Sequence, residues 1–132
     1  MSYRSLPFAV LALAACTAPP YPAWAIEDDA EAVAQVVVTD MTLQDVVRAG
    51  RPLVERVQPD EYLRVVVPIR NIDTESISVL AQMSFLDAER QTLLDDTNRQ
   101  VLVLPPGGTT NFMATSRGRK AADFVLRLSW NK

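Results

Sequence analysis

Hydrophobic and polar residues alternate along much of the chain after residue 34, with the period of two that is typical of a β-strand with one buried face. In the segment 61–70 the apolar residues fall mainly on one face, while Tyr62, Arg64 and Arg70 fall on the other. The β-branched run 35–39 also favours a strand. The pattern predicts strands at 35–39, 61–70, 76–86, 100–104, 109–115 and 123–130.

Turn-forming residues separate these predicted strands. Asn71 and Asp73 follow one strand and Asp87 follows the next, and Asn and Asp side chains cap local backbone groups in turns. The run 105–108 reads Pro-Pro-Gly-Gly. Proline fixes the backbone angle φ and glycine allows values of φ that other residues rarely adopt, so this run predicts another turn. About six or seven short strands with such turns favour an antiparallel β-sandwich or barrel. We therefore expect one all-β domain over residues 35–132.

Residues 42–50 fit two different structures. Thr42 and Asp45 have the spacing of a helical capping box, and Gly50 is placed to end such a helix. A bulged β-strand accounts for the same residues equally well. The sequence leaves both interpretations open.

The N-terminal pattern differs from that of the strands. Arg4 is followed by an apolar run at 6–15, and no further charge occurs before Glu27. An apolar run of about ten residues is too short to span a bilayer, which needs about 20. A basic residue, a short apolar run and then small residues are typical of a secretory signal peptide.

The end of this apolar run, Leu13-Ala14-Ala15-Cys16, resembles the lipobox of bacterial lipoprotein signals. The resemblance implies a signal peptide at residues 1–15, cleavage directly before the cysteine, and acyl chains on Cys16. Several acyl chains hold a protein firmly on a membrane, because each buried methylene contributes about 0.8 kcal/mol. The membrane is therefore an expected partner through the N-terminus.

The residues after Cys16 bear on where the mature protein lies. Thr17, rather than Asp, comes next, and in lipoproteins this implies transport to the periplasmic face of the outer membrane. A rival cleavage site, Ala23-Trp24-Ala25, fits the A-x-A pattern and would release a soluble periplasmic or secreted protein. We favour lipidation, because the rival site lies far beyond the apolar run.

Residues 16–34 then form a predicted tether that starts with the lipidated cysteine. Its first part is rich in proline, and an acidic cluster follows at 27–31. Proline favours extended backbone and like charges repel, so we expect an extended, solvated spacer. An acidic run can also bind a cation or a basic partner, but a spacer is the plainer interpretation.

Composition narrows the chemistry open to the domain. The 132 residues include no histidine and one cysteine, so the commonest general base and metal ligand is missing and no internal disulfide can form. The net charge of −3 gives no reason to expect nucleic acid as a partner. We therefore expect no enzyme, no catalytic residues, no metal and no cofactor.

Two features favour binding. Arg117, Arg119 and Lys120 form a basic turn at 116–120 that can hold an anion or an acidic partner, although a solvated loop is the plainer interpretation. Edge strands expose unpaired backbone groups and can accept a partner strand. Val66 and Leu80 are apolar on otherwise polar faces, and we expect them to lie under a loop or against a partner.

Several short motifs resemble the YcfL-type periplasmic lipoproteins of Gram-negative bacteria. They are the lipobox, Arg70-Asn71 at a strand end, and the segments 83–87, 104–107 and 124–128. The resemblance implies a small β-sandwich of immunoglobulin-like shape, and it supplies no catalytic residues. The expected function is a non-catalytic outer-membrane lipoprotein that acts as an envelope adaptor for another envelope protein. The alternative is a ligand-binding or chaperone-like module that uses the basic turn or an edge strand.

Overall fold

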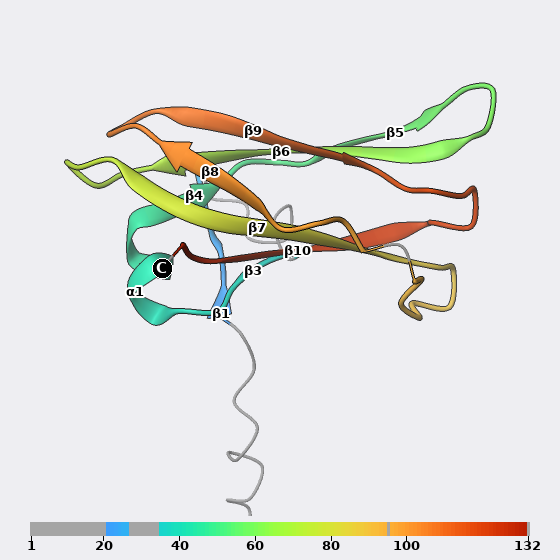
Figure 1. Cartoon of the computed structure of the whole chain (residues 1–132), viewed down its shortest axis with the longest axis horizontal. Helices are drawn as coiled ribbons and strands as arrows, with labels where there is room; N and C mark the ends of the chain where they lie inside the picture. Colours follow the sequence, from blue (N-terminus) through green and yellow to red (C-terminus); the bar gives the residue numbers. More distant parts are fainter. Residues whose placement is uncertain (1–20, 27–34, 95, 132) are drawn as a thin grey trace, which may run out of the picture.

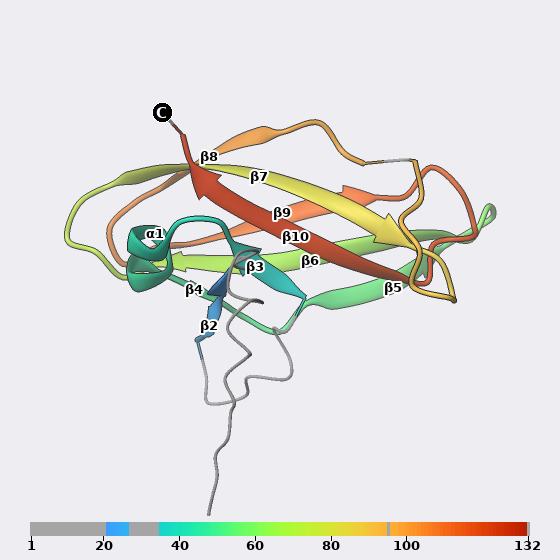
Figure 2. The same ribbon diagram turned by 90° about the horizontal axis from the view of Figure 1, so that it is seen from below.

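The computed structural model describes residues 21–26, 35–94 and 96–131, which form two β-sheets packed face to face (Figures 1 and 2). The predicted signal peptide at 1–15, Cys16 and the acidic cluster at 27–31 lie outside the described residues. No helix in the described part of the chain is long and apolar enough to cross a membrane. The helix that the structure does describe has six residues.

The strands fall into two groups, here named sheet A and sheet B. The order in sheet A is β1 (Tyr21–Pro22), β3 (Val36–Val38), β10 (Asp123–Trp130), β7 (Ile77–Leu86) and β8 (Gln100–Leu104). The order in sheet B is β2 (Trp24–Ala25), β4 (Val47–Ala49), β6 (Tyr62–Asn71) and β5 (Leu53–Val57), with β9 (Thr109–Thr115) also paired to β6. The structure therefore confirms an all-β sandwich.

The sandwich has more strands than the alternation predicts, and two of its pairs are parallel. The parallel pairs are β3 with β10 and β2 with β4. The predicted strands did not include β1, β2 and β5. Strands of two residues are too short to show a period of two, and β5 has no buried residue that would mark an inward face. Alternation also says nothing about strand direction.

Residues 42–50 contain a helix and then a strand, one after the other. Helix α1 (Met41–Val46) leads directly into strand β4. The predicted capping box is wrong, because Asp40 is the N-cap and the Thr42 hydroxyl instead accepts a hydrogen bond from the Trp130 indole at 2.9 Å. Gly50 does not end the helix, but a Cβ there would lie 2.7 Å from Pro68 Cγ, so the residue is required by close packing.

The prediction of a solvated tether is wrong for residues 21–26, which belong to the folded domain. Ala23 is buried, and its amide donates a hydrogen bond to the Val36 carbonyl at 2.9 Å. The Gln44 side-chain amide donates to the Pro22 carbonyl at 2.6 Å. Proline fits the outermost strand of a sheet, where its missing N–H is not needed for pairing. This short segment runs from sheet A to sheet B through Ala23.

The core lies between the sheets, where the inward residues of the long strands meet. Phe85, Phe112 and Phe124 are its largest fully buried side chains. Asn71 is also fully buried, and its amide donates to the carbonyls of Glu75 and Leu104 at 2.8 and 2.9 Å. This asparagine therefore ties the end of β6 to the end of β8.

Candidate functional site

The basic turn at 116–120 links β9 in sheet B to β10 in sheet A. Ser116 is buried at its start, where its hydroxyl accepts a hydrogen bond from the Leu63 amide at 3.0 Å and donates to the Gly118 carbonyl at 2.7 Å. Arg117, Arg119 and Lys120 are exposed. The turn thus has a fixed base and an exposed basic rim.

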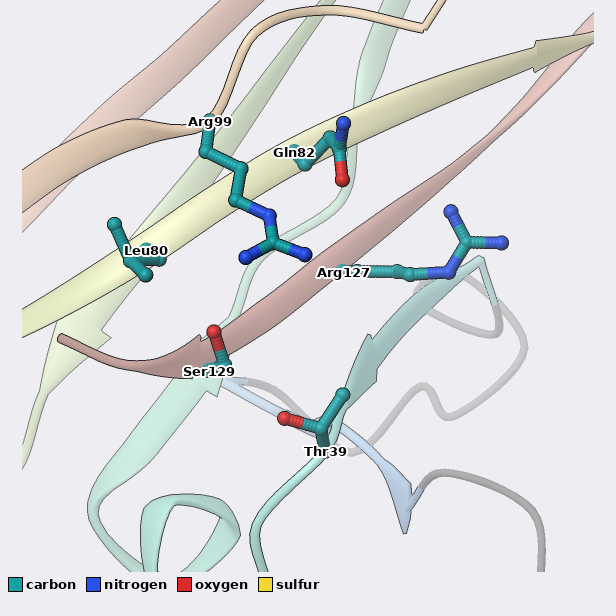
Figure 3. A pocket seen from close by; sticks show the side chains of 6 residues that line it. All are labelled: Thr39, Leu80, Gln82, Arg99, Arg127 and Ser129. Carbon is teal, nitrogen blue, oxygen red and sulfur yellow. The ribbon is translucent and has the colours of Figure 1, made fainter. Parts of the chain in front are cut away.

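A second basic site, which the sequence did not reveal, is a hollow of about 210 Å³ on the outer face of sheet A. Leu80 and Gln82 come from β7, while Arg127 and Ser129 come from β10 (Figure 3). The register pairs Gln82 with Arg127 and Leu80 with Ser129. Arg99, directly before β8, and Thr39, directly after β3, complete the lining.

The two arginines give the hollow its chemistry, and we call it the Arg99–Arg127 hollow. Arg127 Nη1 donates to the Ser84 hydroxyl at 2.7 Å. Among the described residues neither arginine forms an ion pair, unlike Arg64 with Glu55 or Arg90 with Asp123.

Arg99 is exposed and forms no ion pair with a described carboxylate, so its fork of donors can bind an anion through two hydrogen bonds. Arg127, whose Nη1 is bonded to Ser84, has its remaining donors for the same purpose. In Figure 3 the Arg99 side chain reaches across β7 toward β10, whereas the Arg127 side chain points along the sheet face away from Arg99. Neither residue stands out in the sequence, because they lie 28 positions apart and are brought together only by the pairing of β8 and β10 with β7.

The open strands β8 and β9 form another surface, here named the distal edge. Among the described segments β8 is paired only to β7, and β9 only to β6. Val103 on β8 is 63% exposed and Met113 on β9 is 57% exposed. Unpaired strand backbone with apolar side chains can accept a strand from another protein.

Leu80 and Val66, the two apolar residues on otherwise polar strand faces, lie in different surroundings. Leu80 lines the Arg99–Arg127 hollow. Val66 lies between Leu53 and Met113 in a row across the outer face of sheet B. Leu53 is 60% exposed, so the row is open to solvent at both ends and does not lie under a loop.

The opposite side of the sandwich, here named the N-terminal edge, consists of β1, β2 and α1. Trp24 is 44% exposed, and the Arg48 guanidinium lies 4.6 Å from the centre of its ring. Ile26 and Met41 are also exposed. The strand orders place β1 and β8 on opposite edges of sheet A, and β2 and β9 on opposite edges of sheet B (Figure 1).

In the described ranges no group of three or more His, Cys, Asp or Glu side chains is arranged to hold a metal ion. The surfaces described above therefore offer positive charge, hydrogen-bond donors and strand backbone. Such groups bind anions and extended peptides.

Comparison with known proteins identifies the fold. The chain matches no protein-family model and no curated protein sequence. The crystal structure of Campylobacter jejuni cj0090 is similar, with a TM-score of 0.61 and 20% identity over 74% of this chain and 98% of that chain. A DUF1425 family member from Shewanella sp. pv-4 has a TM-score of 0.58 and 15% identity over 65% of this chain and 79% of that chain. The chain thus shares its fold with these bacterial proteins.

Proposed function

We propose that this chain is a non-catalytic lipoprotein, related to the YcfL-type proteins, that Cys16 anchors to the periplasmic face of the outer membrane. Its role in this proposal is to present the sandwich to a protein partner in the envelope. The lipobox residues Leu13, Ala14 and Ala15 support the anchor. The fold shared with bacterial proteins, one of them a DUF1425 family member, is consistent with this assignment.

The observation that carries the proposal is the docking of residues 21–26 onto the domain. Cleavage at the rival site, after Ala25, would remove both β1 and β2. It would also remove the hydrogen bonds that Val36 and Gln44 make with this segment. Cleavage before Cys16 leaves all of these contacts intact, so the fold favours the lipobox over the A-x-A site.

The distal edge supports a protein as the partner. A strand added to β8 or β9 would pair with backbone groups that the described strands leave open. Anchoring confines the domain to the membrane surface and so raises its effective concentration for partners on the same membrane.

The anchor is tested by intact mass and membrane fractionation of the wild type beside Cys16→Ser. We expect the wild type to carry the mass of three acyl chains and to sediment with the outer membrane, while the variant does neither. A mature chain that begins at Ile26 would refute the anchor. In that case the protein would be a soluble periplasmic binding protein.

The partner is tested by photo-crosslinking in living cells. A photoreactive side chain at Val103 or at Met113 should capture the same envelope protein. The matched control places it at Asp60, which is exposed in the turn between β5 and β6, away from the distal edge. Capture at all three positions, or at none, would refute the distal edge as the adaptor surface.

The Arg99–Arg127 hollow favours a second candidate function, a ligand-binding module for a carboxylate or phosphate group. Calorimetric titration with succinate and with inorganic phosphate would test it. We expect Arg99→Gln with Arg127→Gln to abolish binding, and the control Arg119→Gln with Lys120→Gln to leave it unchanged. The reverse result would assign binding to the basic turn, and no binding by the wild type would remove this candidate.

A further inference from the structure

The distance between the anchor and the folded domain is short. Residues 17–20 separate Cys16 from Tyr21, the first residue of β1. Five residue steps span at most about 18 Å even when the chain is fully extended. The polar headgroup layer on each side of a bilayer is about 6 Å thick, so about 6 Å of this length is needed to pass through the one layer that the tether crosses. A lipid on Cys16 therefore holds Tyr21 within about 12 Å of the headgroup surface.

The position of Tyr21 decides which part of the domain is held there. It lies in β1 at the outer edge of sheet A, and β2 follows two residues later at the outer edge of sheet B. Both sheets thus begin at the same side of the sandwich, the N-terminal edge, which is the side nearest to Cys16 along the chain. Strand β8 lies four strand spacings away across sheet A, a distance of about 19 Å.

The side chains of the N-terminal edge have the composition of a membrane interface. Trp24 is partly exposed beside Tyr21 in sequence, and tryptophan and tyrosine favour the headgroup region of bilayers. Ile26 and Met41 add exposed apolar area on the same edge. The Arg48 guanidinium stacks on the Trp24 ring. If Trp24 lies in the headgroup region, this cation lies at the same depth as the lipid phosphates.

We infer that the N-terminal edge is a lipid-contacting surface, with Trp24 in the headgroup region and Arg48 beside the lipid phosphates. This inference rests on the proposed anchor at Cys16. It adds an orientation, in which the distal edge faces away from the membrane. The occupant of the N-terminal edge is thus the bilayer that carries the acyl chains.

Tryptophan fluorescence tests the orientation, because Trp24 and Trp130 are the two tryptophans of the chain. Acylated Trp130→Phe protein, purified from membranes, retains Trp24 as its fluorophore. The matched control carries Trp24→Phe, Trp130→Phe and Val103→Trp, which moves the fluorophore to the distal edge. Both are reconstituted into phosphatidylethanolamine–phosphatidylglycerol vesicles with acyl chains brominated near the glycerol end.

We expect the bromines to quench most of the Trp24 emission and to shift it to shorter wavelength, and to leave the control emission unchanged. Arg48→Gln in the Trp130→Phe background should weaken the quenching. If the Trp130→Phe change lowers the melting temperature, the wild type and Trp24→Phe are compared instead. The quenched share of emission should then disappear in Trp24→Phe.

Other outcomes overturn the inference in distinguishable ways. Acylated protein that sediments with the vesicles but shows no Trp24 quenching keeps its anchor and loses this orientation. Stronger quenching in the control reverses the orientation. Protein without acyl mass, detected before reconstitution, refutes the anchor and the inference together.

Discussion

The two edges of the sandwich are built in opposite ways. On the N-terminal edge, sheet A ends with β1 and sheet B with β2, each of two residues, and α1 packs on β1, β3 and β4. The five-residue strand β5 continues this side of sheet B farther along β6. The distal edge ends the sheets with strands of five and seven residues. Short edge strands leave few unpaired backbone groups, whereas long ones leave many. The part of the N-terminal edge formed by β1, β2 and α1 therefore leaves few backbone groups unpaired, whereas the distal edge leaves many in both sheets.

The composition of the distal edge strengthens the contrast. Proteins commonly protect long edge strands with charged residues. Strand β8 has the sequence QVLVL, with no charge, and Val101 and Val103 on it are exposed. Exposed apolar residues on an unprotected edge strand are typical of an interaction surface. The contrast thus supports assigning the partner to the distal edge and the membrane to the N-terminal edge.

Asn71→Ala should have the largest effect, because it removes the buried side chain that holds the distal edge. The change leaves the Leu104 and Glu75 carbonyls without their donor, and the Asp73 amide without its acceptor. An unpaired buried group, here the Leu104 carbonyl, costs about 1–3 kcal/mol, and the two part-buried groups add less because water can reach them, so we expect the free energy of unfolding to fall by about 3 kcal/mol. Urea denaturation followed by circular dichroism measures it.

The matched control for this variant is Asn111→Ala on β9, whose side chain is exposed. Its free energy of unfolding should change by less than about 0.5 kcal/mol. Equal losses in the two variants would mean that the hydrogen bonds of Asn71 do not hold this edge together.

Gln44→Ala should have a smaller effect and should loosen the N-terminal edge alone. The change removes the hydrogen bond to the Pro22 carbonyl, which water can replace because Pro22 is exposed, so we expect a loss of about 1 kcal/mol. Hydrogen exchange should accelerate at the amides of Ala23 and Ile26, which donate to Val36 and Ala49. Exchange in β8 and β9 should stay at the wild-type rate.

The control for Gln44→Ala is Asp45→Ala, the exposed neighbour on the same helix. It should leave the exchange of Ala23 unchanged. Faster exchange across the whole domain in Gln44→Ala would show that the N-terminal edge unfolds only together with the sandwich.

Val103→Lys should have the smallest effect on stability and a specific effect on association. The side chain is exposed, so the free energy of unfolding should change by less than about 0.5 kcal/mol. A lysine on an edge strand opposes pairing with another strand. We therefore expect weaker partner capture from Met113, measured by photo-crosslinking, while Ile72→Lys in the exposed turn after β6 leaves capture intact.

The sequence predicted the parts of the fold that rest on long alternation. Strands β6 and β7 have ten residues each, enough for the period of two to stand out from chance. Strands β1 and β2 escaped prediction because the prolines around them are typical of an extended spacer, and their pairing depends on contacts with Val36 and Gln44. Local composition cannot reveal a contact that distant residues provide.

The candidate sites also differ in whether they depend on residues that are close in sequence or on residues that only the fold brings together. Arg117, Arg119 and Lys120 are close in sequence, so the basic turn could be recognised there. The Arg99–Arg127 hollow could not, because it requires the register of β10 on β7 and the place of β8 beside them. Four of its residues are outward positions on β7 and β10, and Arg99 and Thr39 lie just outside the ends of β8 and β3.

The passage of residues 21–26 from one sheet to the other also has a mechanical meaning. For a chain held at Cys16, a pull on the domain loads β1 first, and its two pairs with β3 would separate one after the other. Once β1 and β2 have peeled away, the first docked residue after Cys16 is Val36 instead of Tyr21, so the length of free chain between the anchor and the domain rises from about 18 Å to about 70 Å. These two short strands would therefore hold the domain close to the membrane until a load separates them from β3 and β4.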